Sequence, residues 1–287
     1  GRLSSALNAY RLIDADTYTE AQHLAEFLDG ENRERQRITK EIQEEVESNF
    51  DPDQSQYLVS SIDAGYNEGV LGLAASRLTE SFYRPSVIGA VKEGIIKASC
   101  RSLPEVNIID ALDGCSEFLM RYGGHAMAAG LTIAAEKCAE FLTALDQQIS
   151  TQLNHLPLDP KIYFDAEVKN YDLNEGLYRY LQLLEPTGNS NPSPVLFMQG
   201  VRLLDVKRLG NNGEHLKFFI EAADPKNPNR KRSFQAIAFR FGQQSCFKNG
   251  ELVDFLFTFE ENEFNGNTNL QLKIREMRIH NPNLQDA

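Results

Sequence analysis

The stretch of this chain best suited to bind an anion is RYGGHAMAAGLTI, residues 121–133. Two glycines allow backbone dihedrals that point successive N–H groups at one ligand, and His125 adds a side-chain donor. The small residues that follow leave room for a ligand to approach. The stretch suggests a phosphate-binding turn, but the same pattern also predicts a helix C-cap in which Gly123 or Gly124 is left-handed.

A second polar stretch, KASCRS at residues 97–102, has residue types that hold phosphate oxygens. Arg101 can bind them through its planar fork, and Ser99 and Ser102 through short hydroxyl hydrogen bonds. The alternative interpretation is a strand end with an ordinary surface arginine. We do not expect Cys100 to be a nucleophile, since no histidine base can be assigned to it.

Metal-dependent chemistry is not predicted within this chain. Metal-assisted phosphoester hydrolysis needs clustered carboxylates and histidines, whereas the five histidines are dispersed and form no HxH, HxxxH or DHH motif. No GxSxG, Walker or GxGxxG motif is present either. The sequence therefore predicts neither a catalytic residue nor a bound metal or cofactor here.

The formal net charge of −12 argues against bulk attraction to nucleic acid, but the charge is unevenly distributed. Residues 1–150 hold 13 Lys+Arg against 24 Asp+Glu, and residues 151–287 hold 16 against 17. A local groove for a polyanion is thus possible in the second half. The candidate contacts with single-stranded DNA are Lys207, Arg208, Lys217, Arg230, Lys231 and Arg232. The aromatic residues there could stack on bases or belong to the core: Phe218, Phe234, Phe239 and Phe264.

The elements that must position these residues fall into three parts. Residues 1–50 contain a long connecting helix that starts near Asp16 with a capping box from Thr17 to Glu20. Residues 51–153 alternate strands and helices and predict a small α/β domain. Its expected elements are a strand at 57–62, helices at 69–83, 107–124 and 136–153, and a hairpin at 86–100.

The last part, residues 154–287, is rich in β-strand patterns separated by turn clusters. Only residues 174–185 read as a helix. Five or so strands in about 130 residues suggest a small closed or partly open antiparallel barrel of the OB-fold type. The fold class predicted is therefore α/β plus all-β.

Composition indicates a cytoplasmic protein. The sequence contains no apolar run long enough for a membrane span and no signal-peptide pattern at residues 1–14. The four cysteines form no CxxC pair and occur in apolar segments, so we expect buried, reduced thiols rather than disulfides or a zinc site.

Taken together, these motifs resemble the carboxyl-terminal part of the RecJ family, single-strand-specific 5′-to-3′ exonucleases of the DHH phosphoesterase superfamily. NEGVLGLAASRL, KASCRS and YGGHAMAAGLTI resemble its DHH-associated domain. LEPTGNSNPSPVLF, HLKFFI, AIAFRFG and ENEFNGNTNLQLKIREMRI resemble the OB barrel that follows. Two departures are Ala98 and Cys100, where the family has glycines, and Tyr66, where a tryptophan is common.

The resemblance implies that Ser99, Arg101, Ser102, Gly123, Gly124 and His125 hold the phosphates of single-stranded DNA. It also implies that Mn²⁺ or Mg²⁺ on a DHH domain, expected to be missing from this chain, performs the hydrolysis. The fragment alone would then be inactive in an exonuclease of DNA repair and recombination. Two alternatives stay open: a module that docks repair or replication proteins, and a fragment of a DHH-family hydrolase of small phosphoesters.

Overall fold

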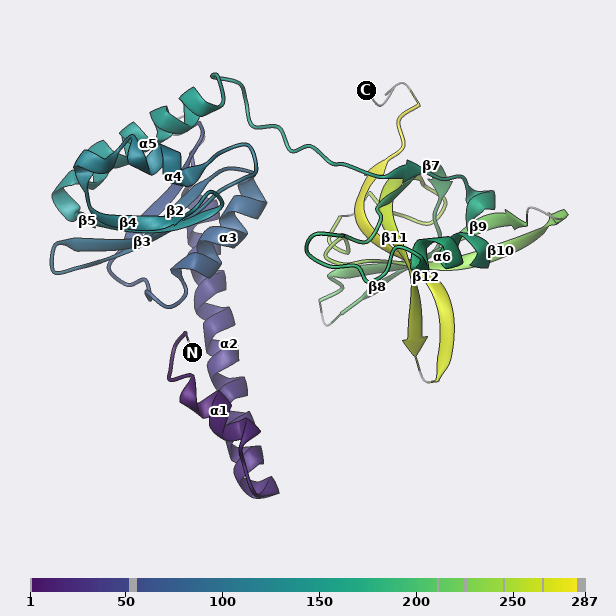
Figure 1. Cartoon of the computed structure of the whole chain (residues 1–287). Coiled ribbons are helices and arrows are strands. Elements are labelled where there is room, and N and C mark those ends of the chain that lie inside the picture. Colours follow the sequence, from purple (N-terminus) through teal and green to yellow (C-terminus); the bar gives the residue numbers. More distant parts are fainter. Residues whose placement is uncertain are drawn as a thin grey trace. The chain divides into compact units, whose positions relative to one another are not determined.

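The computed structural model describes residues 2–51, 56–210, 212–224, 227–244, 246–264 and 266–282, with backbone alone for 223, 224, 227–231, 264 and 267. Its contacts divide the chain into two compact units, Gly1–Pro160 and Lys161–Ala287. Each unit has its own sheet and its own core (Figure 1). None of the helices in these described ranges is both long and apolar enough to span a membrane.

The first unit opens with two helices, α1 (Leu7–Ile13) and α2 (Tyr18–Asn49). The long helix is confirmed, and so is the Thr17 half of its capping box, because the Thr17 hydroxyl accepts the Glu20 N–H at 3.3 Å. Ile42 and Val46, near the end of α2, are buried against the core of the unit. The charged middle of α2 is largely exposed and carries i,i+3 and i,i+4 ion pairs.

The first sheet has five strands in the order β1-β2-β3-β5-β4. Only β1 pairs in parallel, and β4 is an edge strand. The predicted hairpin is confirmed: β2 and β3 are joined by Glu93 and Gly94, whose φ angles are +52° and +76°. The strands are β1 (Val59–Asp63), β2 (Ser86–Lys92), β3 (Ile95–Arg101), β4 (Leu119–His125) and β5 (Ala128–Ala134).

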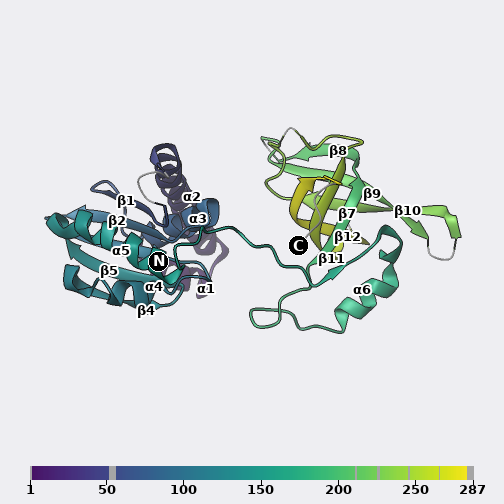
Figure 2. The ribbon, with the colours of Figure 1, turned by 90° about the horizontal axis from the view of Figure 1, so that it is seen from above.

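Helices cover this sheet on both faces but to different extents. On one face α3 (Leu71–Phe82) packs on β1, β2 and β3. On the other, α4 (Ile108–Asp113) and α5 (Cys138–Gln152) bury the even-numbered residues of β3, and they lie over the sheet in Figure 2. Gly123 and Gly130, on β4 and β5, are exposed on the face that bears α3.

The helix predicted for residues 107–124 is wrong. Helix α4 ends at Asp113, a 3-10 turn spans Ser116–Phe118, and the chain then forms strand β4. The glycine pair does not cap a helix, since Gly123 and Gly124 pair with Gly130 and Ala129 of β5.

The second unit is built on a seven-stranded sheet in the order β6-β7-β11-β12-β10-β9-β8. Most pairs are antiparallel, but β6 pairs with β7, and β10 with β12, in parallel. The predicted helix is confirmed as α6 (Glu175–Gln182). The strands are β6 (Ala166–Glu167), β7 (Leu196–Arg202), β8 (Leu204–Leu209), β9 (His215–Asp224), β10 (Asn227–Ala238), β11 (Leu252–Phe264) and β12 (Asn267–Ile279).

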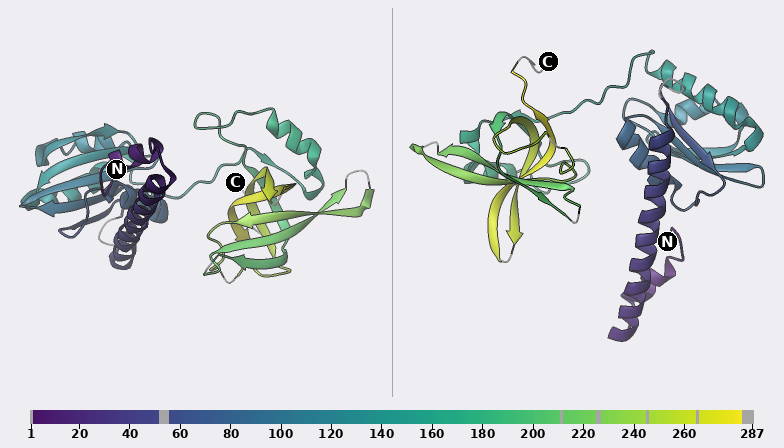
Figure 3. Two further views of the ribbon diagram at one scale, coloured as in Figure 1. Left: turned by 90° about the horizontal axis from the view of Figure 1, so that it is seen from below. Right: turned by 180° about the vertical axis from the view of Figure 1, so that it is seen from behind.

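Strands β7 and β8 are separated by Leu203 alone, yet they lie at opposite sides of the sheet order. β7 pairs with β11, and β8 pairs with β9. In the described ranges no hydrogen-bonded ladder joins the two edges, so of the two expected forms of barrel, closed and partly open, the sheet is not the closed one. Instead, one bent stretch of chain serves both edges, and the sheet curls round on itself (Figure 3).

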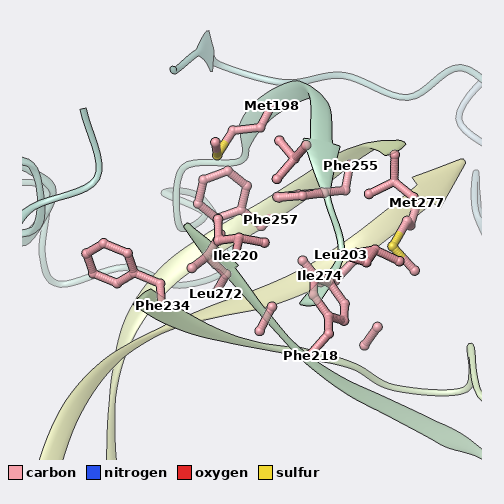
Figure 4. Packing of buried hydrophobic residues seen from close by; sticks show 14 of the residues in the cluster. Met198, Leu203, Phe218, Ile220, Phe234, Phe255, Phe257, Leu272, Ile274 and Met277 are labelled. Atoms are coloured by element: carbon pink, nitrogen blue, oxygen red, sulfur yellow. The ribbon is translucent and has the colours of Figure 1, made fainter. Parts of the chain in front are cut away.

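The inside of this curled sheet is filled by aromatic and aliphatic side chains. Phe218 and Phe255 meet edge to face with ring centroids 6.4 Å apart, and both are buried (Figure 4). Phe234 is also buried and packs on Phe259. Phe218 and Phe234 are therefore core residues. The side chain of Phe264 is outside the described set.

Candidate nucleic-acid interface

The hairpin β4–β5 presents the glycine-histidine stretch as extended edge strand rather than as a concave turn. His125 pairs with Ala128, so the turn itself consists of Ala126 and Met127. Both turn carbonyls accept hydrogen bonds from backbone N–H groups outside the hairpin: Met127 O accepts the Ser102 N–H, and Ala126 O accepts the Ile108 N–H, each at 3.0 Å. The tip of the hairpin is thus fixed by backbone hydrogen bonds.

The strand register brings the predicted phosphate residues into rows across β3, β5 and β4. Arg101 pairs with Ala128, which pairs with His125. Two residues along, Ser99 pairs with Gly130, which pairs with Gly123. Because side chains alternate between faces, both rows lie on the face opposite α4 and α5. The side chains predicted to bind phosphate therefore flank small residues, which leave the sheet surface open between them.

The two glycines differ in what they do. A Cβ on Gly123 would meet nothing within 4 Å, so the position is open to a ligand. Gly124 has a φ of +156°, and a Cβ there would lie 2.3 Å from Ala128 O and 2.6 Å from Ala129 Cα. Gly124 is therefore required by the hairpin backbone, whereas Gly123 leaves the surface bare.

Arg101 is held in place by α3. Its Nε donates to the Ser76 hydroxyl at 3.0 Å, and its Nη1 donates to the Cys100 carbonyl at 2.7 Å. A Cβ on Gly72 would lie 2.7 Å from Arg101 Nη2 and 3.6 Å from Ser99 Oγ. Gly72 and Ser76, one helical turn apart, thus let α3 approach and orient the guanidinium. Neither residue is among those predicted from the sequence, although their i,i+4 spacing is visible there.

Two residues of the KASCRS stretch point away from this surface. Ser102 is buried, and its hydroxyl donates to the Val106 carbonyl at 2.7 Å. Cys100 is fully buried, and burial raises the pKa of its thiol to about 12. We therefore assign Ser102 to the support of the hairpin tip rather than to the phosphate surface, and the thiol of Cys100 to the core.

The four cysteines are free, but they do not share one environment. Cys115 is buried like Cys100, Cys138 is half-buried, and Cys246 is exposed. The expectation of buried thiols is thus wrong for Cys246. Within the residues that the structure describes, no group of three or more His, Cys, Asp or Glu side chains could hold a metal ion. The resemblance places Mn²⁺ or Mg²⁺ on a DHH domain rather than on these residues, and we derive no catalytic step from them.

A groove of about 1240 Å³ lies on the second unit, between α6 and the outward faces of β9, β10 and β12. Lys217 and Arg232 line it, together with Phe219, Phe239 and Gln235. Lys217 Nζ lies 5.9 Å from the centroid of the Phe219 ring, within cation–π range.

The other predicted basic residues are distributed differently. Lys207 forms an ion pair with Asp205 at 2.8 Å, and Arg208 Nε donates to the Gly242 carbonyl at 2.6 Å. Neither lines the groove. The side chains of Arg230 and Lys231 lie outside the described set. Of the four predicted aromatic residues, Phe239 is the one described as exposed, at 46%, and it packs against His215.

The two units match two known kinds of domain. The family model described as the DHHA1 domain matches residues 54–151, and the one described as the RecJ OB domain matches residues 164–276. The two matches thus give this protein a DHHA1 domain followed by an OB domain, as the sequence predicts. The second model is described as that of RecJ, and the two matches follow each other along the chain.

Relatives match over nearly all of this chain. It is 29% identical to the single-stranded-DNA-specific exonuclease RecJ of Bacillus subtilis, over 97% of this chain and 35% of that protein. It is also 29% identical to RecJ of Haemophilus influenzae, over 96% of this chain and 48% of the relative. The chain thus spans less than half the length of these relatives.

A solved structure supports the same assignment. The crystal structure of RecJ from Thermus thermophilus in complex with Mn²⁺ matches with a TM-score of 0.74 and 26% identity. The match covers 96% of this chain and 39% of that one.

Proposed function

We propose that this chain is the DNA-holding part of a RecJ-type 5′-to-3′ single-stranded-DNA exonuclease that serves DNA repair and recombination. The observation that carries the proposal is the alignment of Arg101 with His125, and of Ser99 with Gly123, on one open sheet face. Such a face offers donors for phosphate oxygens and no bulk between them. Hydrolysis is assigned to Mn²⁺ or Mg²⁺ held by residues other than those described.

The OB domain would bind the same strand. Its groove combines cations with the rings of Phe219 and Phe239, the combination that single-strand binding uses: charge for the backbone and aromatic faces for the bases. Among its cations Lys217 and Arg232 are the predicted contacts that line the groove. A cytoplasmic location is part of the proposal, and it is supported by the four free cysteines.

The test is a titration of a labelled 20-nucleotide thymidine strand with the 287-residue chain at 50 and 200 mM salt. We expect salt-dependent binding that Arg101→Ala weakens by about tenfold, since hydrogen bonds to charged groups contribute about 1.5–3 kcal/mol. Lys137→Ala, which removes an exposed cation from η2 (Ala135–Lys137), serves as the control. Absence of binding, or equal loss in both variants, would refute the proposal for this face.

The groove is tested separately with Lys217→Ala/Arg232→Ala. Loss of both cations should weaken binding of the 20-nucleotide strand and lower the slope of log K against log salt by about 1.4, at 0.7 per phosphate contact on a single strand. Unchanged affinity would remove the groove from the DNA path.

That outcome would favour a second candidate function, the docking of repair or replication proteins. One observation supports it: the region of α6 carries three exposed apolar side chains, Tyr180, Leu183 and Leu184, at 74%, 77% and 48% exposure. Serine substitutions at Tyr180 and Leu183 would leave DNA binding intact if this surface serves proteins alone.

A further inference from the structure

The row next to the proposed phosphate site carries two more cations. Lys97 pairs with Thr132 of β5, and Thr132 pairs with Arg121 of β4. The three residues share parity with Ser99, Gly130 and Gly123, and so they lie on the same face. Tyr122, which follows Arg121, instead packs against the core under α4 and α5.

This row has the chemistry of an anion site. The strands lie about 4.8 Å apart, so about 9.6 Å separates the backbones of Lys97 and Arg121, and both long side chains can reach over Thr132. Arg121 is exposed, and in the described part of the chain no hydrogen bond or ion pair is assigned to its guanidinium. Its fork is available for bidentate binding of phosphate.

Lys97 is partly occupied. Its Nζ lies 3.0 Å from Glu68 Oε2, and both side chains are about half exposed or more. Such a surface pair contributes little stability and is readily exchanged for another anion. Arg121 is therefore the main anion-binding residue of the row, and Lys97 is the secondary one.

The strand pairing also limits the rows to three. Beyond Lys97 the next pair on this face is Ile95 with Ala134, which is apolar. In β4 the register shifts between Leu119 and Arg121, leaving Met120 as an extra residue. At the other end the rows stop at the turn of Ala126 and Met127 after His125. The polar surface is therefore limited to these three rows.

We propose that Arg121, Thr132 and Lys97 form a second phosphate site, which binds the next phosphate but one from that held by Arg101 and His125. Each row is two residues from the next, about 6.7 Å along the strand, which is of the order of the separation between neighbouring phosphates of an extended strand. The row of Arg121 is two rows, about 13.4 Å, from the row of Arg101, with the row of Ser99 and Gly123 between them. The DNA backbone would then follow the direction of β3, β5 and β4. This inference rests on the proposed function of the Arg101 row.

The experiment compares two probes by calorimetric titration of the full 287-residue chain: thymidine 5′-monophosphate and 5′-phosphorylated trithymidylate. The first carries one phosphate and the second carries three, enough to span the three rows. We expect wild type to bind the trinucleotide more tightly. Arg121→Ala should lose about tenfold in affinity for the trinucleotide and leave the mononucleotide unchanged, and Arg121→Lys should recover part of the loss.

Two further variants sharpen the test. Glu68→Gln frees Lys97 and should strengthen trinucleotide binding, whereas the control Lys137→Ala should change nothing. If Arg101→Ala weakens both probes but Arg121→Ala weakens neither, the second phosphate site is wrong and the proposed function stands. If Arg101→Ala weakens neither, or wild type binds neither probe, the proposed function fails and this inference with it.

Discussion

Replacing Gly124 by alanine should destabilise the first unit, whereas replacing Gly123 by alanine should leave its stability unchanged and weaken DNA binding. In Gly124→Ala the new Cβ would meet Ala128 O at 2.3 Å and Ala129 Cα at 2.6 Å, and both are backbone atoms that cannot rotate away. The φ of +156° adds strain for any L-residue. Such strain costs about 1–3 kcal/mol and overpacking costs a similar amount, and partial relief comes from the position of β4 at the sheet edge.

We therefore expect Gly124→Ala to lower the unfolding free energy of the first unit by at least about 2 kcal/mol, which is a fall of about 4–8 °C in Tm for a unit of this size. Gly123→Ala should leave Tm unchanged or slightly raised, because its Cβ meets nothing within 4 Å. It should instead weaken single-stranded DNA binding, because the methyl group would lie where we propose that a phosphate approaches.

Scanning calorimetry measures the first effect, and hydrogen exchange of peptides from residues 119–134 localises it. The titration with the 20-nucleotide strand measures the second. A Gly124→Ala variant that melts with wild type would contradict the backbone argument. A Gly123→Ala variant that binds DNA like wild type would contradict the close approach of a phosphate to the second row.

Three further predictions use other contacts. Ser76→Ala should weaken DNA binding through Arg101 alone, so that in a double-mutant cycle it has no effect once Arg101→Ala is present; additive effects would show that Ser76 acts independently. Burial opposes ionisation of Asp254, but hydrogen bonds from Gly200 N–H, His280 and Arg278 outweigh it and lower the carboxyl pKa. The ionised carboxylate therefore stabilises the second unit above the unfolded pKa of about 4, and this stabilisation is lost as the pH falls from there through the lowered pKa of the folded state. Asp254→Asn should lower the unfolding free energy by about 3–5 kcal/mol at pH 7, and by less at pH 3, as measured by urea unfolding. A thiol reagent at pH 8 should label Cys246 in the native protein and Cys100 only after unfolding; labelling of Cys100 in the folded chain would contradict its burial.

The elements that the sequence predicts well are those whose signals are local. The Glu93-Gly94 turn, the Thr17 cap and the spacing along α2 each lie within a few residues of what they determine, and the structure confirms all three. The segment 107–124 failed because its apolar spacing fits a helix while the glycine pair fits a helix end. What overrides this pattern is long-range pairing of β4 with β5.

The candidate site was recoverable in part. Residue types identified Arg101 and His125, but only the register across β5 places them in one row. Alternation along a strand could have separated Ser99 and Arg101 from Ser102, because it assigns them to opposite faces. Nothing in the sequence pattern indicates that Ser76 would hold the guanidinium, since that contact joins residues 25 positions apart.

The bent strand of the second unit affects how this sheet meets other chains. Long unpaired strand edges are templates for strand addition and aggregation. Here β7 and β8 place the two ends of the sheet on one continuous stretch of chain, and the terminal strands β6 and β8 have only two and six residues. The longest strands, β11 and β12, are paired on both sides. The domain for which we propose binding of a flexible, extended DNA strand is thereby protected from pairing with an extended polypeptide instead.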